Sequence, residues 1–239
     1  MKKENYICST YFKKKANKQS GWVFGFDDYI YMKNWYESAN NFNLKCIVFH
    51  DSLSNEFIEK YNKIQFIKVE QSNLNIIDYR WVVYDEYLKN NKENVNLMLF
   101  TDMSDVVFLK NPFDLISTKP DTIFVGDEPT TVSDGWNKKR SVYFHGVIPE
   151  IISHEKNNGS KKLLNCGIVG GEVGIVSEFV HEMADILLKA NLDLTTFDMT
   201  VLNYLLYTKY VNKIFSGSPL NTRFKGNEKN NKICYIKHK

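Results

Sequence analysis

Short apolar runs alternate with helical patterns along most of the chain. The runs predict β-strands at residues 6–10, 45–50, 64–69, 97–101, 122–126, 163–169 and 233–236. Apolar residues spaced three and four apart predict helices at residues 28–40, 55–61, 76–88, 176–190 and 197–207. This alternation is typical of βαβ units, so we expect an α/β fold with a mixed, mostly parallel, Rossmann-like sheet flanked by helices.

The clearest helical pattern covers residues 176–190. Val176, Phe179, Val180 and Met183 repeat at helical spacing and define one buried face. The next predicted helix, from residue 197, has Thr195 or Thr196 available as its N-cap.

Two long segments, residues 128–162 and 216–232, show little periodicity. Irregular stretches of this length in a folded domain are more often binding loops or lids than connectors. The chain has no internal repeat and no linker rich in Pro, Gly and Ser. We therefore expect one domain over residues 1–239.

Charge and composition exclude two classes of protein. The 31 basic and 28 acidic residues give a net charge of +3, too balanced for a nucleic-acid-binding surface. No stretch approaches the roughly 18 apolar residues of a membrane span, and the first residues carry charge but no apolar signal region. We expect a protein that is neither exported nor inserted in a membrane.

The four cysteines lie far apart in the sequence and form no Cys-x-x-Cys pair. Each lies in an apolar, strand-like setting, at positions Cys8, Cys46, Cys166 and Cys234. They are predicted to be reduced core thiols, as in a cytoplasmic protein.

The segment LFTDMSDVVFLKNPF, residues 99–113, places two carboxylates directly after an apolar strand. Aspartate is disfavoured in strands and costly to bury, so Asp102 and Asp105 require a turn, a partner or a ligand. With Ser104 they offer adjacent oxygen atoms, which suit Mg²⁺ or Mn²⁺ at the carboxyl end of a strand. Alternatively, Asp102 caps a turn and Asp105 pairs with a surface cation.

Four segments in order resemble the GT-A glycosyltransferases, and most of all the bacterial relatives of the glycogenin-like group. They are the acidic T-D-x-x-D segment followed by VVF and NPF, LLNCGIVGG at 163–171, FDMTVLNYLLY at 197–207, and the final ICYIKHK. The resemblance covers most of the chain and implies a GT-A fold.

The same resemblance implies roles for several residues. Asp102 and Asp105, with His238, match the site that binds Mn²⁺ or Mg²⁺. The family's acids lie two positions apart and these lie three apart, so either aspartate could be the principal ligand. Asn165 matches an asparagine that contacts the donor sugar, and Asp198 matches an acid that binds sugar hydroxyls. Asp198 could equally be a helix cap or a first-turn acid.

Further residues are candidates for donor binding, each with a structural alternative. Gly167, Gly170 and Gly171 would let a sugar approach the backbone, or would form a bulge or tight turn. Arg80 is expected to be a buried partner for an acid of the 102–105 segment, ahead of a diphosphate contact or a surface charge.

The end of the first predicted strand is where GT-A proteins bind the nucleotide base. Thr10 and Tyr11 lie there, and Tyr11 would stack on the base or belong to the core. Lys237 would assist His238 at the diphosphate. In the long irregular segment, Trp136 would stack on a sugar, although a structural role is favoured for both Trp136 and His145.

Together these features predict a metal-assisted glycosyltransferase. It would move a sugar from a nucleoside-diphosphate sugar to a hydroxyl of a glycan or other acceptor, as in cell-surface polysaccharide synthesis at the cytoplasmic face of the membrane. An inverting reaction would need a base, for which Asp198, Asp127 and Glu128 are candidates, whereas a retaining one would not. The alternatives are a weak or inactive nucleotide-sugar-binding relative and a metal-dependent nucleotidyltransferase.

Overall fold

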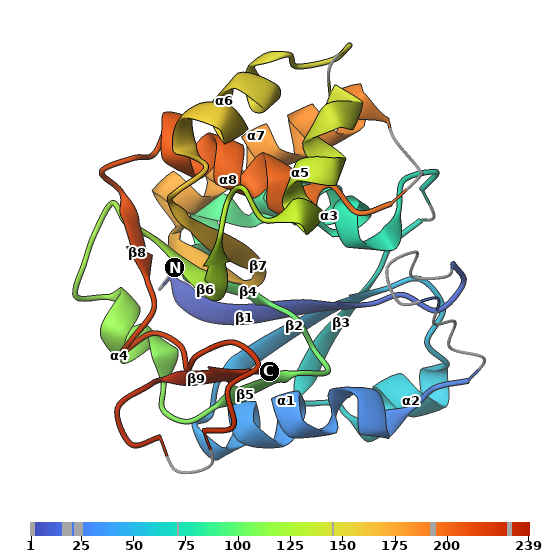
Figure 1. Cartoon of the computed structure of the whole chain (residues 1–239). Helices are drawn as coiled ribbons and strands as arrows, with labels where there is room; N and C mark the ends of the chain where they lie inside the picture. Colours follow the sequence, from blue (N-terminus) through green and yellow to red (C-terminus); the bar gives the residue numbers. More distant parts are fainter. Residues whose placement is uncertain are drawn as a thin grey trace.

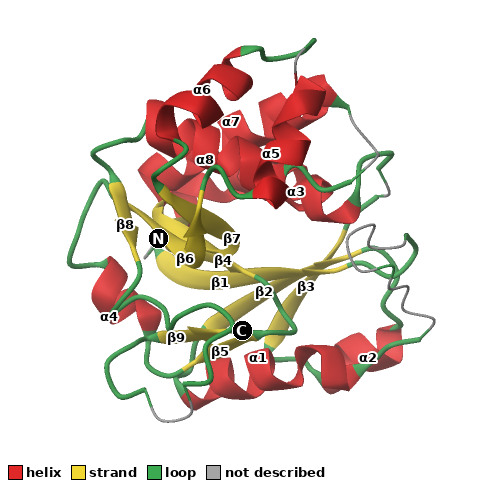
Figure 2. Ribbon diagram, viewed as in Figure 1, coloured by secondary structure: helices red, strands yellow, loops and turns green. Residues whose placement is uncertain are grey.

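A seven-stranded sheet runs through the middle of the protein (Figures 1 and 2). The computed structural model describes residues 3–15, 21, 26–70, 72–144, 146–191, 195–228 and 231–239. The strand order is β3-β2-β1-β4-β7-β6-β8. The strands are β1 (Glu4–Tyr11), β2 (Lys45–His50), β3 (Ile64–Lys68), β4 (Val95–Thr101), β6 (Ile123–Thr131), β7 (Lys162–Glu172) and β8 (Ile214–Ser216).

Strands β3, β2, β1 and β4 are parallel, and β7 pairs antiparallel with both β4 and β6. A separate two-stranded sheet joins β5 (Val106–Phe108) to β9 (Ile236–His238). Near the C-terminus, β9 therefore lies beside the segment that follows β4 (Figure 1).

Helices cover both faces of the main sheet. One face carries α1 (Tyr29–Asn41), α2 (Asn55–Lys60), α4 (Pro112–Ile116) and the β5-β9 pair; the other carries α3 (Ile76–Asn91), α5 (Gly135–Ser141), α6 (Glu150–Asn158), α7 (Val173–Ala190) and α8 (Asp198–Thr208). Successive strand residues face opposite sides, so Ile7 and Leu99 join one core and Cys8 and Met98 the other. Because helices cover both faces of the sheet, the sequences of the central strands are continuous apolar runs.

The expectation of a mixed, mostly parallel α/β sheet flanked by helices is confirmed. The five predicted helices are present within a few residues of their predicted ends, and helix α7 begins three residues early, at Val173. Among the strands, β2 has the predicted bounds and β6 runs five residues further, to Thr131.

Three predictions about local structure were wrong. Residues 128–162 are not irregular: they contain the end of β6 and the helices α5 and α6. The last strand covers Ile236–His238 and not residues 233–236, because it pairs with β5. The α8 N-cap is Phe197, with no side-chain cap of its own, so neither Thr195 nor Thr196 has this role. The description of residues 217–228 as irregular is confirmed.

Two further expectations concern burial and membranes. All four cysteines are free and buried, as predicted. Over the part of the chain that the structure describes, no helix has the length and apolar character needed to cross a membrane.

Candidate functional site

The acidic segment leaves the sheet at the carboxyl end of β4. Thr101, the last residue of β4, accepts hydrogen bonds from Ser9 Oγ to its carbonyl (2.8 Å) and from Trp35 Nε1 to its hydroxyl (2.7 Å). The next amide, of Asp102, donates to the carbonyl of Gly167 in β7 (3.0 Å). These bonds fix the point at which the chain turns away, so the two aspartates project from a rigid strand end.

Asp102, Asp105 and His238 converge on one point. His238 Nε2 lies 3.8 Å from Asp102 Oδ2 and 3.8 Å from Asp105 Oδ2. A small divalent cation about 2.1 Å from each ligand requires donor atoms roughly 3 to 4 Å apart. Each aspartate side chain is 34% exposed and His238 is buried. We call these three residues the metal triad.

The pairing of β5 with β9 brings His238 to the aspartates. Val106 pairs with His238, and the amide of Lys239 donates to the carbonyl of Asp105 (3.1 Å). The amide of His238 in turn donates to Thr222 Oγ1 (3.2 Å). A residue more than 130 positions along the chain is thus held beside the acids by backbone bonds.

Two observations indicate that the metal triad fits a cation. Asp105 Oδ1 is buried and has no hydrogen-bond partner among the described residues, so this carboxylate can still accept a cation. A Cβ on Gly167 would lie 2.3 Å from His238 Cε1 and 2.7 Å from Asp102 Oδ2, so any larger residue would intrude on the ligands. Two carboxylates and an imidazole form a donor set suited to Mn²⁺ or Mg²⁺.

The two aspartates have opposite electrostatic settings. Burial would raise the pKa of Asp102, but the charges of Arg80 and His238 outweigh burial and hold that pKa well below its usual range. Burial and the charge of Asp102 raise the pKa of Asp105 to about 6. Two adjacent carboxylates resist ionising together, and a bound divalent cation would remove that conflict.

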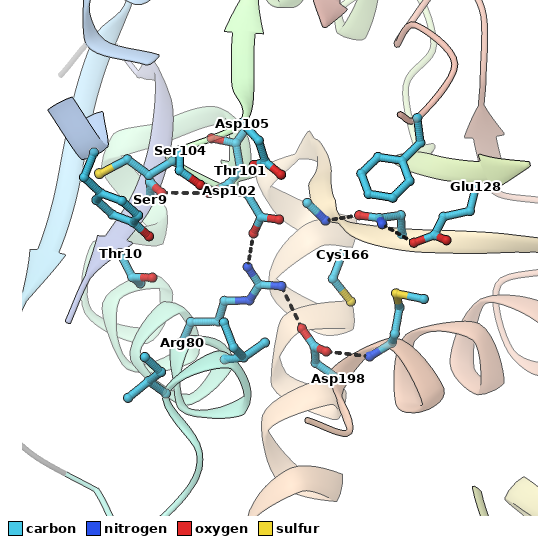
Figure 3. A pocket seen from close by; sticks show the side chains of 18 of the residues that line it. Ser9, Thr10, Arg80, Thr101, Asp102, Ser104, Asp105, Glu128, Cys166 and Asp198 are labelled. Atoms are coloured by element: carbon cyan, nitrogen blue, oxygen red, sulfur yellow. Dashed lines mark hydrogen bonds and ion pairs between the residues drawn. The ribbon is translucent and has the colours of Figure 1, made fainter. Parts of the chain in front are cut away.

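Arg80 of α3 joins the metal triad to a third acid (Figure 3). Its guanidinium is buried, and it pairs through Nη1 with Asp102 and through Nη2 with Asp198 Oδ2 at 2.7 Å. The expectation that Arg80 is a buried partner of an acid in the 102–105 segment is confirmed. Because one arginine holds two acids from different elements, the positions of Asp102 and Asp198 are coupled.

Asp198 is the first residue of α8, and an acid from another helix holds it in place. Asp78 Oδ1, in α3, accepts from the amides of Phe197 (2.9 Å) and Asp198 (2.8 Å). Asp78 therefore caps α8 from a neighbouring helix, and the carboxylate of Asp198 is left to bind Arg80 and the amide of Met199 (2.7 Å). Burial and the charge of Asp198 raise the pKa of Asp78 to about 8.

Asn165 lies in β7 beside the metal triad. Its Oδ1 accepts from the amide of Gly167 (2.6 Å), and its Nδ2 donates to Glu128 Oε1 (2.7 Å). Both ends of the amide are therefore oriented by the protein. Asn165 links the metal triad to Glu128, which stands at the opposite side of Figure 3 from Ser9 and Thr10.

One cavity of about 1030 Å³ is lined by Arg80, Asp102, Asp105, Glu128, Asn165 and Asp198, and Asp78 and His238 do not line it. Its wall brings together the predicted residues Thr10, Arg80, Asp102, Ser104, Asp105, Asn165, Gly167 and Asp198. The wall also contains residues for which the sequence predicted no role, among them Asp28, Asp134 and Lys225. No sequence motif distinguishes these three from ordinary loop residues.

Four predicted donor contacts do not line this cavity. Tyr11 is fully buried, its ring 5.0 Å from that of Tyr31, so it belongs to the core and cannot stack on a base. A Cβ on Gly170 would lie 2.5 Å from the carbonyl oxygen of Met98, and one on Gly171 would lie 2.5 Å from that of Thr122, so both glycines serve sheet packing. Lys237 alternates with His238 along β9 and points to the other side.

The structure shows the contacts of two other candidate residues, Trp136 and Asp127. Trp136 lines the cavity and packs partly against the core. Asp127 is buried, pairs with Lys162 Nζ (2.5 Å) and accepts from Asn221 Nδ2 (2.9 Å), so it fastens β6 and does not serve as a base in the cavity. His145 lies outside the described residues.

Comparison of the sequence with protein-family models gives no match, and none of the curated proteins matches it.

Proposed function

We propose that this protein is a GT-A-type glycosyltransferase that uses a nucleoside-diphosphate sugar and Mn²⁺ or Mg²⁺. The observation that carries the proposal is the position of Asp102, which belongs to the metal triad and also pairs with Arg80, the partner of Asp198. A cation-binding group and a sugar-binding carboxylate thus lie on two sides of one guanidinium, in a cavity large enough for a nucleotide sugar.

The donor would lie across the cavity in a defined direction. Its nucleoside would occupy the end lined by Thr10, Phe12 and Ile77, at the carboxyl end of β1. Its diphosphate would reach the metal triad, where a bound cation neutralises the charge that grows on the leaving group. Asp198 would accept hydrogen bonds from the sugar hydroxyls, and Asn165 would accept or donate them. These bonds would orient the anomeric carbon.

The transfer exchanges one carbon–oxygen bond for another. The bond from the anomeric carbon to the diphosphate breaks, and its electron pair remains on the diphosphate. The acceptor hydroxyl oxygen forms the new bond to that carbon and loses its proton. Glu128 and Asp198 line the cavity and are the candidate bases for an inverting reaction, whereas Asp127 does not line it.

The acceptor and cellular location belong to the same proposal. We infer a glycan acceptor, glycosylated in the cytoplasm or at the inner face of the membrane, because the resemblance to bacterial GT-A enzymes implies it.

A screen of nucleotide sugars tests this function. The protein is incubated with each donor and Mn²⁺, and nucleoside diphosphate release is measured with and without EDTA. We expect metal-dependent release from at least one donor, and a loss of about 100-fold or more in Asp198→Asn, which keeps the side-chain size but removes the charge. Donor binding without release would favour an inactive nucleotide-sugar-binding protein, and release that EDTA does not affect would contradict the metal triad.

A further inference from the structure

Trp136, on the first turn of α5, lines the cavity, and so do Glu128 of β6, Asp134, Leu163 and Met199. Asp134 accepts from the amide of Trp136 and from Thr130, which lies two residues along β6 from Glu128. None of these residues is needed to hold a nucleotide or a cation in the proposed donor site. We call these five lining residues the Trp136 region.

Arg140 holds the Trp136 indole in a fixed position. The guanidinium carbon lies 3.4 Å from the ring centroid, so it covers part of one face. Arg140 also donates to the carbonyl of Trp136 (2.9 Å), the carbonyl of Thr196 (3.0 Å) and Thr195 Oγ1 (3.2 Å). With the arginine fixed by three bonds, the indole surface that lines the cavity is a rigid apolar platform.

Two carboxylates accompany this platform. Asp134 accepts from the amide of Trp136 (2.9 Å) and from Thr130 Oγ1 (3.3 Å), and Glu128 Oε1 accepts from Asn165 Nδ2 (2.7 Å). Within the described part of the chain, Glu128 Oε2 has no hydrogen-bond partner. Carboxylate oxygens accept hydrogen bonds from hydroxyl groups, and an aromatic ring packs against C–H bonds. A pyranose ring presents both kinds of group.

We propose that the Trp136 region binds the pyranose ring of an uncharged acceptor sugar, an inference that rests on the proposed glycosyl transfer. The ring stacks on Trp136, and its hydroxyls donate to Glu128 and Asp134. The two carboxylates outnumber the Arg140 guanidinium that stacks on the same indole, so a uronic acid is disfavoured.

The position of the region suits an acceptor. Glu128 is one hydrogen bond from Asn165, which is itself bonded to the amide of Gly167 beside the metal triad. On the other side, Arg140 is bonded to Thr196, two residues before Asp198. An acceptor here adjoins the two residues that would hold the donor sugar.

The binding test needs no activity. Indole ¹H–¹⁵N resonances of the intact protein are recorded with diamagnetic Mg²⁺ and uridine diphosphate, and the Trp136 signal is assigned as the one absent from Trp136→Phe. Methyl β-glucopyranoside, methyl β-galactopyranoside and methyl α-mannopyranoside are titrated, with methyl β-glucuronide as the anionic control. We expect a saturable shift of the Trp136 signal with at least one neutral glycoside and none with the glucuronide. No shift with any neutral glycoside, or an equal shift with the glucuronide, would overturn the proposal.

The activity test separates this inference from the proposed function. With an active donor, transfer to the best methyl glycoside is compared with hydrolysis by water. We expect the ratio of transfer to hydrolysis to fall at least tenfold in Trp136→Ala and to stay within twofold of wild type in Val142→Ala, an exposed control beside α5. An unchanged ratio in Trp136→Ala would refute the acceptor subsite while leaving glycosyl transfer intact. A protein that hydrolyses no donor would refute glycosyl transfer, and the indole titration would still decide whether the region binds a sugar.

Discussion

Asp105 and Asp127 look alike in the sequence but have opposite surroundings in the fold. Each follows an apolar run. Asp127 is buried, and the Asp105 side chain is 34% exposed but has a buried Oδ1. Asp127 pairs with Lys162 and Asn221, so both of its oxygens have partners. Asp105 lies 3.8 Å from His238, and its enclosed Oδ1 has no partner among the described residues. The hydrogen-bond partners of an acid, more than its burial, therefore distinguish a candidate binding group from a structural one.

The largest expected effect comes from Asp105→Asn. Removing one charged ligand of three should weaken Mn²⁺ binding by about 100-fold or more, roughly 2.7 kcal/mol. The melting temperature in EDTA should stay the same or rise, because the change removes a like charge beside Asp102. Calorimetric titration with Mn²⁺ and thermal unfolding in EDTA measure the two effects. Unchanged Mn²⁺ affinity would remove Asp105 from the metal triad.

The opposite pattern is expected for Asp127→Ala. The substitution leaves Lys162 and the buried Asn221 without their acceptor, so the free energy of unfolding should fall by about 2 kcal/mol. Lys162 is more than half exposed, so the loss reflects mainly the buried amide. Urea denaturation measures it. Mn²⁺ affinity within twofold of wild type is the accompanying expectation, and a large loss of affinity would erase the distinction between the two acids.

How far the sequence predicts the site depends on how local each contact is. The exit of Asp102 and Asp105 from β4, and the pairing of Arg80 with one of them, were predicted because a strand, a turn and a buried cation each leave a local pattern. The last strand was misplaced because its bounds depend on pairing with β5, more than 120 residues away.

Two other features of the site had no local signal. Helix α5 was missed because it is short and carries three consecutive basic residues, which interrupt the apolar periodicity. The cap of α8 was assigned to Thr195 or Thr196 because capping residues usually come from the same helix, and here the acceptor is Asp78 of α3. The sequence suggested that Trp136 could stack on a sugar. It did not predict the contacts of α5 with Thr195 and Thr196 that hold the ring, because these depend on both elements.

A smaller effect, about tenfold, is expected from pH. A proton on Asp105, whose pKa is raised to about 6, competes with a cation for the carboxylate. Mn²⁺ affinity should therefore rise about tenfold from pH 5 to pH 7 and level off above. Titrations at several pH values measure it, and Asp105→Asn should lose the part of the dependence that comes from Asp105 and keep any part that comes from His238. A flat profile in the wild-type protein would mean that Asp105 is ionised throughout the range.

The smallest effect concerns Asp78, which combines features of both acids. Its Oδ1 accepts two amides, as a structural acid would, and its Oδ2 is buried without a partner. Asp78 does not line the cavity, and its pKa is raised to about 8, so near pH 6 the carboxyl keeps its proton. An unpartnered oxygen thus indicates a ligand site only where it faces the cavity.

Asp78→Asn tests this distinction through stability. The pKa of Asp78 is higher in the folded state than in the unfolded state. The protonated carboxyl therefore contributes its full stabilisation below the unfolded-state pKa near 4, and this stabilisation is lost as the pH rises through about 8. Asparagine keeps the oxygen that accepts the two backbone amides, and it cannot ionise. The free energy of unfolding of the variant, relative to that of wild type, should therefore increase by roughly 1 kcal/mol from pH 6 to pH 7. Asp78→Ala, which removes the acceptor, should be less stable at every pH. If the difference in unfolding free energy between Asp78→Asn and wild type does not change with pH, Asp78 is ionised throughout this range. Its Oδ2 would then need a partner.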